Sequence, residues 1–204
     1  FFSRRIGLNA PIQFGERLSG KLNKYLRFGA MNMQTGEVAE SALPAQNFTV
    51  MALQRQVGAR SNIGGILVNK QSLRYDPDQV ADGKPVYSEF NRNVGLEYNL
   101  ASANNLWTGK AMVLQSFGPE NQGRGFVHAA NLKYASGNLT WNWQHEYVSE
   151  NYTAEVGFVP RNGFYRISPM IGYRWFPKSE KILSHGPDLN TSIFFNKQGE
   201  QTDN

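Results

Sequence analysis

The nine residues Leu139–Tyr147, which read LTWNWQHEY, decide the fold class of this chain. Within them a mostly apolar or aromatic side chain recurs at every second position, and a polar one occupies each position between. The first set is Leu139, Trp141, Trp143, His145 and Tyr147, and the second is Thr140, Asn142, Gln144 and Glu146. Because successive side chains of a β-strand point to opposite faces of a sheet, this alternation predicts a strand with one apolar and one polar face.

The same period of two recurs along most of the chain, whereas apolar stripes with helical spacing are nearly absent. Clear alternation also predicts strands over residues 93–100, 126–134 and 165–175. Weaker alternation predicts strands over residues 12–22, 25–33, 47–57, 61–68, 106–117 and 189–196. The sum is about ten strands of about ten residues each, with no convincing helix, so the sequence predicts an all-β fold.

Two of these segments are less regular than the others. Pro169 lies in the middle of the strand expected over residues 165–175, where proline removes a hydrogen bond of the ladder. We therefore expect a bulge there, an edge position, or different strand boundaries. The segment Phe48–Val57 is apolar on both faces for several residues, which leaves its orientation open.

The connections between the expected strands alternate between short and long. Short turns are expected near Asn23–Lys24, Gly58–Arg60, Ala101–Asn105 and Ala135–Asn138, and long loops at Gln34–Gln46, Asn69–Val86, Gly118–Arg124 and Val148–Gly163. Only the last connection, residues 176–188, departs from this rhythm. An antiparallel up-and-down meander with tight turns at one end and long loops at the other is typical of outer-membrane β-barrels, whose long loops face out of the cell. Soluble sandwiches use Greek-key crossovers instead.

Strand length and the placement of aromatic residues favour the same interpretation. A tilted strand of about 9–11 residues crosses a bilayer, whereas strands of soluble proteins cluster near 5–6 residues. Aromatic residues gather at the expected strand ends, namely Trp107, Phe117, Phe126, Tyr134, Tyr147, Tyr165 and Trp175. We expect them to form two girdles at the lipid–water boundary. The alternative is a soluble barrel or lectin-like sandwich in which these side chains fill a core.

Composition excludes several functional classes. The 204 residues are 40% hydrophobic and 18% charged with a net charge of +5, which disfavours a disordered chain, and no basic run suited to nucleic acid is present. No stretch matches the roughly 18 apolar residues of a membrane-spanning helix. The absence of cysteine excludes disulfides, thiolate zinc sites and a cysteine nucleophile. Because the chain opens on Phe1 rather than Met, we expect one β-barrel region, residues 1–204, belonging to a longer chain.

Five short stretches carry a resemblance to a known family. They are Phe2–Ile6 (FSRRI), Asn32–Gly36 (NMQTG), Pro44–Phe48 (PAQNF), Arg60–Gly64 (RSNIG) and Glu155–Arg161 (EVGFVPR). Together they resemble the C-terminal region of the bacterial family of domain of unknown function 5916. The resemblance implies a barrel in the Gram-negative outer membrane, behind a periplasmic domain similar to family-9 carbohydrate-binding modules. It implies a location more than an activity.

The polar faces of the strands carry the candidate functional residues. If the apolar rows face lipid, seven polar residues line the barrel interior: Glu97, Asn99, Asn142, Gln144, Glu146, Arg166 and Arg174. Their mixed charges suit either a hydrated pore or a salt-bridged, plug-like interior. In a soluble sheet the same residues would form a solvated outer face.

Trp141 and Trp143 are the candidate sugar-stacking residues, because they share one strand face two residues apart. A place in an aromatic girdle or a core is the competing interpretation of this pair. The pair, together with the carbohydrate-binding-like domain that the resemblance implies, supports the alternative function, a soluble carbohydrate-binding or glycan-processing β domain.

No motif predicts a metal site or a catalytic site. His128 and His145 can meet across neighbouring strands but lack a third ligand. Asp76, Asp78 and Asp82 resemble the start of a calcium loop, but the closing Glu is missing, which favours a polar surface loop. The chain has no nucleophile motif and no singled-out pair of carboxylates.

We therefore expect an outer-membrane β-barrel segment with a structural, transport or surface-assembly role, without a catalytic site, metal or cofactor. Outer-membrane lipid is the expected partner. Glycans and other outer-membrane proteins are further candidate partners, and nucleic acid is not.

Overall fold

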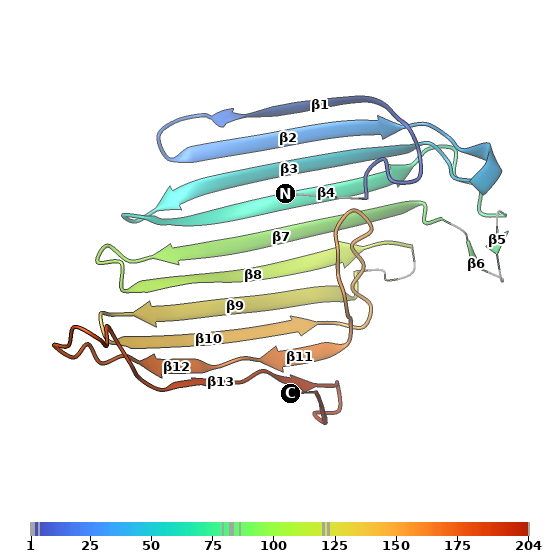
Figure 1. Ribbon diagram of the computed structural model, residues 1–204. Helices are drawn as coiled ribbons and strands as arrows, with labels where there is room; N and C mark the ends of the chain where they lie inside the picture. Colours follow the sequence, from blue (N-terminus) through green and yellow to red (C-terminus); the bar gives the residue numbers. More distant parts are fainter. Residues whose placement is uncertain are drawn as a thin grey trace.

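The computed structural model describes residues 3, 5–78, 80–81, 84–85, 87–119, 121 and 123–203. Within these residues the chain forms one large antiparallel sheet whose strands follow one another in chain order (Figure 1). The predicted all-β antiparallel meander is therefore confirmed. The helical structure in the described part of the chain is one short 3-10 turn, η1 (Ala39–Ser41). No helix there is long or apolar enough to cross a membrane.

Long strands make up most of the sheet. They are β1 (Ile12–Lys21), β2 (Leu26–Thr35), β3 (Gln46–Val57), β4 (Ser61–Ser72), β7 (Phe90–Ala101), β8 (Trp107–Phe117), β9 (Gly125–Ala135) and β10 (Leu139–Val148). Shorter strands are β5 (Val80–Ala81), β6 (Lys84–Pro85), β11 (Phe164–Ile167), β12 (Met170–Tyr173), β13 (Asp188–Asn190), β14 (Ile193–Phe195) and β15 (Gln201–Asp203). β5 and β6 form a small hairpin of their own, and the others extend the sheet beyond β10.

The two ends of the long strands differ as the sequence predicted. Tight turns follow β1, β3, β7 and β9 at one end, and longer loops follow β2, β4, β8 and β10 at the other (Figure 1). Side chains that accept backbone N–H groups hold three of the tight turns: Asn23 accepts from Leu26, Asn104 from Leu106, and the Ser136 hydroxyl from Leu139. Short polar side chains of this kind stabilise turns because they replace a backbone acceptor.

Pro169 interrupts the strand predicted over residues 165–175. The structure has β11 before it and β12 after it, so this prediction is corrected to two strands. The register with β10 continues across the break, because Ser168 and Gln144 exchange both backbone hydrogen bonds. Pro169 lacks only the N–H that would point toward Thr191, whose own N–H still donates to the Pro169 carbonyl at 3.3 Å. The proline thus removes one ladder bond without a bulge against β10.

The sheet is open in the described structure. β1 pairs only with β2, and β15 pairs only with β14, so each leaves one side of its backbone without a strand. Every residue of β1 is exposed, on both faces. Long, exposed edges of this kind invite pairing with further strands.

The two faces of the sheet differ in polarity and in exposure. Cross-strand register places Leu53, Leu96 and Val113 on one side, called here the apolar face. Large hydrophobic side chains that lie exposed on it include Leu18, Met51, Leu53, Ile63, Val94, Leu96, Tyr98, Val113, Phe126, Trp143, Ile171, Tyr173 and Leu189. On the opposite side, the polar face, the strand residues Asn91 and Ser116 are almost fully buried.

The buried part of the molecule lies on the polar face, under a loop. Residues 149–163, called here the inward loop, leave β10 and return across the polar face before β11 begins (Figure 1, orange). Val156 of this loop packs with Phe48, Val50 and Val68, and Tyr152 packs with a second group. That second group is Val127, Val148 and Phe164. The apolar residues on both sides of β3 are thus explained, since one side faces out and the other lies beneath the loop.

Candidate functional site: the polar face and the inward loop

The polar face carries all seven residues that the alternation grouped together. One row crosses the sheet from Glu97 through Met112 and Ala129 to Glu146 and Arg166. The others on this face are Asn99, Asn142, Gln144 and Arg174. The sheet therefore brings together residues that lie up to 77 positions apart, from 97 to 174.

Ion pairs link most of the charged members of this set. They are Glu97 with Lys110 at 2.6 Å, Glu146 with Arg166 at 2.7 Å, and Arg174 with Asp188. All six side chains are between about a quarter and a half exposed. Pairs this accessible contribute roughly 0–1 kcal/mol each to stability, so their main consequence is that each carboxylate is neutralised locally.

Amide side chains form a hydrogen-bonded network with the Glu97 ion pair. The Asn99 Nδ2 donates to Glu97 at 3.0 Å and to Asn62 at 2.9 Å, and the Gln54 Nε2 donates to the same Asn62 oxygen at 2.9 Å. Farther along, the Asn131 Nδ2 donates to Asn142 at 2.6 Å. Amides bonded in this way leave further donors and acceptors available to water or to a solute.

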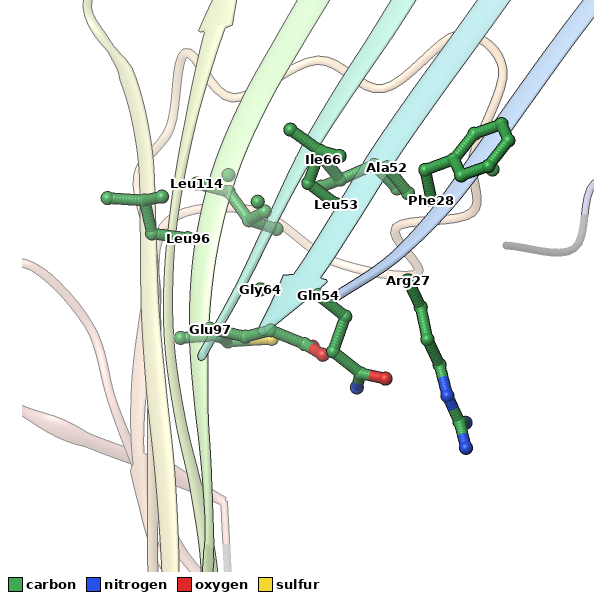
Figure 2. A pocket seen from close by; sticks show the side chains of 14 residues that line it. Arg27, Phe28, Ala52, Leu53, Gln54, Gly64, Ile66, Leu96, Glu97 and Leu114 are labelled. Atoms are coloured by element: carbon green, nitrogen blue, oxygen red, sulfur yellow. The ribbon is translucent and has the colours of Figure 1, made fainter. Parts of the chain in front are cut away.

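A hollow of about 340 Å³ lies beside this network (Figure 2). The hollow forms because several of the residues that line it on the polar face have small side chains or none, among them Gly29, Ala52 and Gly64. Figure 2 shows the Glu97 and Gln54 side chains close to each other at its rim, with the Arg27 side chain extending away from them. The hollow thus combines a mostly apolar floor with a charged and amide-bearing rim.

The inward loop is attached to the sheet by a buried cation. The Lys70 Nζ of β4 lies 2.5 Å from the Glu155 carboxylate of the loop, and the Lys70 side chain is only 8% exposed. The Ser88 hydroxyl donates to the other Glu155 oxygen at 2.6 Å. Because a buried ammonium without a partner is costly, this pair ties the position of the loop to that of β4.

Asn91 of β7 forms a second attachment. Its Oδ1 accepts the Glu155 backbone N–H at 3.1 Å and the Asn93 amide at 2.8 Å, and its Nδ2 donates to the Thr153 Oγ1 at 3.0 Å. Asn91 is 1% exposed. A buried amide with these bonds orients the loop, since losing the side chain would leave loop groups without partners.

A third attachment holds the start of the loop against β8 and β9. The Thr153 N–H donates to the Ser116 hydroxyl at 3.2 Å, and Asn121 Nδ2 donates to the same hydroxyl at 2.8 Å. Gly125 lies directly beneath, where an added Cβ would come within 3 Å of the Ser116 hydroxyl and of the loop backbone at Asn151. Glycine is therefore required at residue 125 for this close approach.

Tyr152 and Val156 are the deepest residues of the inward loop, at 4% and 1% exposure. Burial raises the pKa of the Tyr152 phenol to about 12, because the phenolate would lose its hydration. The Val156 carbonyl accepts a hydrogen bond from the Ser3 hydroxyl at 2.5 Å, so the N-terminal segment also lies against the loop. The loop is a packed element, with its own share of the hydrophobic core.

A family model matches residues 23–204, and its description is a domain of unknown function, DUF5916. The chain belongs to the DUF5916 family. No curated protein and no solved structure matches it. In this DUF5916 chain the EVGFVPR stretch, Glu155–Arg161, lies in the inward loop and begins with the residue that binds Lys70.

The two candidate sugar-stacking residues lie on the apolar face, away from the ion pairs. Trp141 contacts the ring of Trp107, with centroids 6.2 Å apart, and Trp107 in turn contacts Tyr134 at 4.9 Å. Trp143 is 37% exposed, and its Nε1 donates to His145 at 3.3 Å. Both tryptophans thus belong to an aromatic surface that covers several strands.

The histidine and aspartate candidates do not assemble a metal site in the described residues. The rings of His128 and His145 lie 5.4 Å apart on the apolar face, where His128 also stacks on Tyr147. The Asp76 carboxylate accepts the Asp78 backbone N–H at 3.0 Å, which is a local turn. Asp82 lies outside the described residues, and no group of three potential ligands occurs among the residues that are described.

The sequence alone did not single out the residues that hold the inward loop, namely Lys70, Asn91, Ser116 and Glu155. Strand alternation places a residue on a face but carries no information about a loop that returns to that face. One sequence feature did point to a covering element: β3 is apolar on both sides, and a single uncovered sheet needs only one apolar side. That signal indicated a covering element without identifying it.

Proposed function

We propose that this chain forms part of the wall of a bacterial outer-membrane β-barrel, with a structural, transport or surface-assembly role. The observation that carries the proposal is that apolar side chains are exposed on one face while polar side chains are buried on the other, which is the reverse of the usual arrangement in a water-soluble protein. Leu96, Trp143 and Ile171 are 58%, 37% and 48% exposed, whereas Asn91 and Ser116 of the opposite face are buried. Lipid is the solvent that makes such an exposed apolar face favourable.

The dimensions of the apolar face support a membrane location. On β9 the aromatic residues Phe126 and Tyr134 share that face, eight positions apart. At about 3.4 Å per residue they are roughly 27 Å apart along the strand, or about 20 Å across a bilayer for a tilt of about 40°. The apolar band of an outer-membrane barrel is about 25 Å tall, which is similar.

The free edges support a ring that includes further strands. Inside a bilayer, unpaired backbone groups of β1 and β15 would each cost several kcal/mol, on the order of a lost hydrogen bond in hydrocarbon. In the proposed barrel these edges pair with additional strands. The polar face then encloses water, and the inward loop narrows the enclosed space on the side of the long loops.

The proposed partners follow from this orientation. The apolar face would contact outer-membrane lipid, while glycans or other outer-membrane proteins would reach the chain through its long loops. The polar face offers ion pairs and amides rather than a nucleophile with a base, so the role we propose for it is to line a passage or a plugged interior.

Two neighbouring positions on β8 test the orientation, because the chain contains no cysteine of its own. Met112 lies on the polar face and Val113 on the apolar face. In the intact protein inserted into lipid vesicles, we expect Met112→Cys to react with a charged, water-soluble thiol reagent and Val113→Cys to resist it. A lipid-soluble maleimide should label Val113→Cys, which controls for its accessibility. Equal reaction of both cysteines with the charged reagent would overturn the proposal.

A soluble carbohydrate-binding or glycan-processing domain is the second candidate. The exposed Trp143, beside the half-buried Trp141 on the same face, favours it, because sugars stack on aromatic rings. Saturable quenching of tryptophan fluorescence by a glycan, abolished in Trp143→Ala, would support this candidate. Solubility of the intact protein without detergent or lipid would count in the same direction.

A further inference from the structure

The charged residues of the polar face are not balanced. Its described acidic side chains in the sheet are Glu97, Glu146 and Asp188, and each has a cationic partner on the same face. Lys70, the other paired cation, binds the loop residue Glu155. Four further cations stand on this face without a carboxylate partner: Arg17, Lys21, Arg27 and Lys133. The described face therefore has an excess of positive charge.

Two of the four unmatched cations are direct neighbours, and a third lies farther along the same strand face. Lys21 of β1 lies directly opposite Arg27 of β2, and Arg17 stands on the same face of β1. Like charges directly opposite each other on a sheet repel, so this arrangement costs stability unless an anion lies between them. The polar-face residues of β1 to β3 include no carboxylate that could serve.

One of these cations also borders the hollow of Figure 2. Arg27 lines that hollow together with Gln54, and its side chain extends away from the Glu97 rim. The Arg27 guanidinium and the Lys21 ammonium, on residues paired across β1 and β2, match phosphate or carboxylate oxygens in charge and in hydrogen-bonding capacity.

We propose that the cationic patch Arg17, Lys21 and Arg27 binds anionic solutes that carry phosphate or carboxylate groups. This inference rests on the proposed function, because it assigns a solute class to the aqueous side of the wall. The anion sits over β1 and β2 beside the hollow, and its charge replaces the missing carboxylate. Lys133 extends the positive potential toward β9, so that anions are concentrated along the polar face.

Single cysteines measure this potential directly. Ser19 lies between Arg17 and Lys21 on the polar face, and Ala129 lies on the same face beside the matched pair of Glu146 and Arg166. In vesicles, the ratio of modification rates by an anionic and a cationic thiosulfonate reagent should be roughly fivefold higher for Ser19→Cys than for Ala129→Cys. The excess should disappear near 1 M salt and in a background with Arg17, Lys21 and Arg27 all changed to Gln.

Inorganic phosphate and citrate are the binding probes. Each should slow modification of Ser19→Cys by a neutral thiol reagent, saturably, and neither should protect it in the triple Gln background. Equal reagent ratios at the two cysteines, or an absence of protection by both anions, would overturn the inference. Leu18→Cys, one residue away on the apolar face, separates this result from the orientation of the wall. If Leu18→Cys reacts in vesicles as fast as Ser19→Cys, the membrane proposal fails, whatever the charge ratio shows.

Discussion

The polar face has two halves that are built differently. Near the long loops it is covered: the inward loop packs Val156 against the sheet, and the buried side chains of Lys70 and Asn91 bind the loop residue Glu155. Near the tight turns it is open, and Glu97 and Lys110 form a pair that is about a third to a half exposed. The two halves belong to the same strands, so strand pairing alone does not distinguish them.

The covered half contributes more to the stability of the sheet than the open half does. Under the loop, each side chain is removed from water and its hydrogen bonds are worth more, because an unsatisfied buried group costs about 1–3 kcal/mol. In the open half, water competes for every contact and the same ion pair is worth little. We therefore expect equal substitutions to have unequal effects on the two halves.

Placing a charge in the covered half should have the largest effect. Val156→Asp buries a carboxylate among Phe48, Val50 and Val68, and we expect it to release the inward loop and to lower the free energy of unfolding by at least about 3 kcal/mol. Urea titration followed by tryptophan fluorescence, and protease sensitivity of the loop, measure both effects. Phe158→Asp is the matched control, because Phe158 belongs to the same loop but is 79% exposed, and it should cost less than about 0.5 kcal/mol. Similar losses for the two variants would show that the loop is not packed.

Removing the buried amide should have an intermediate effect. Asn91→Ala leaves the Glu155 N–H without its acceptor and removes one of the two amide donors to the Thr153 hydroxyl. We expect the free energy of unfolding to fall by about 2 kcal/mol and proteolysis of the loop to become faster. Asn69→Ala is the control, since Asn69 lies on the apolar face and accepts only an exposed bond from Arg92. For Asn69→Ala we expect the free energy of unfolding to fall by about 0.5 kcal/mol or less. Equal losses would remove the distinction between covered and open contacts.

Breaking ion pairs should give the smallest effect and the sharpest contrast. Lys70→Met leaves Glu155 unpaired, and because that carboxylate is a third exposed we expect a loss of only about 1 kcal/mol, little changed by salt. Lys110→Met in the open half, and Lys197→Met in the surface pair with Glu150, should each lower the free energy of unfolding by less than about 0.5 kcal/mol. This small effect should disappear in high salt, which screens exposed charges. The comparison is made by urea titration at low and high ionic strength. A salt-sensitive Lys70→Met loss, no greater than that of Lys197→Met, would contradict the assignment of Lys70 to a buried site.

The strands themselves were predictable because their signal is local. Alternation of the kind seen in Leu139–Tyr147 depends only on neighbouring residues, and the tight turns are held by side chains such as Asn23 and Asn104 within a few residues of the bonds they accept. The eight predicted strands that correspond to β1–β4 and β7–β10 therefore agree closely with the structure, whereas the one predicted over residues 189–196 is divided into β13 and β14. The strand around Pro169 was mispredicted as continuous, because alternation persists where a single missing N–H ends the regular ladder.

The candidate site was predictable only in part, for the same reason. The alternation of side chains along each strand was enough to group Glu97, Gln144 and Arg166 on one face. Residues paired across neighbouring strands share a face, so the grouping holds from strand to strand. The alternation could not show that Lys110 is the partner of Glu97, because that pairing depends on which residues the cross-strand register places side by side.

By itself, then, the sequence of this DUF5916 member determined the fold class, the strand order of an up-and-down meander and the separation of apolar from polar side chains. Those properties follow from a period of two and from short turns, which are encoded within about a dozen residues. Three features depend on tertiary contacts instead: the return of residues 149–163 over the polar face, the pairing of Lys70 with Glu155 across 85 positions of sequence, and the opposition of Lys21 and Arg27 without a carboxylate. Such contacts arise from closure of long loops and from cross-strand register, for which no local pattern of residues exists.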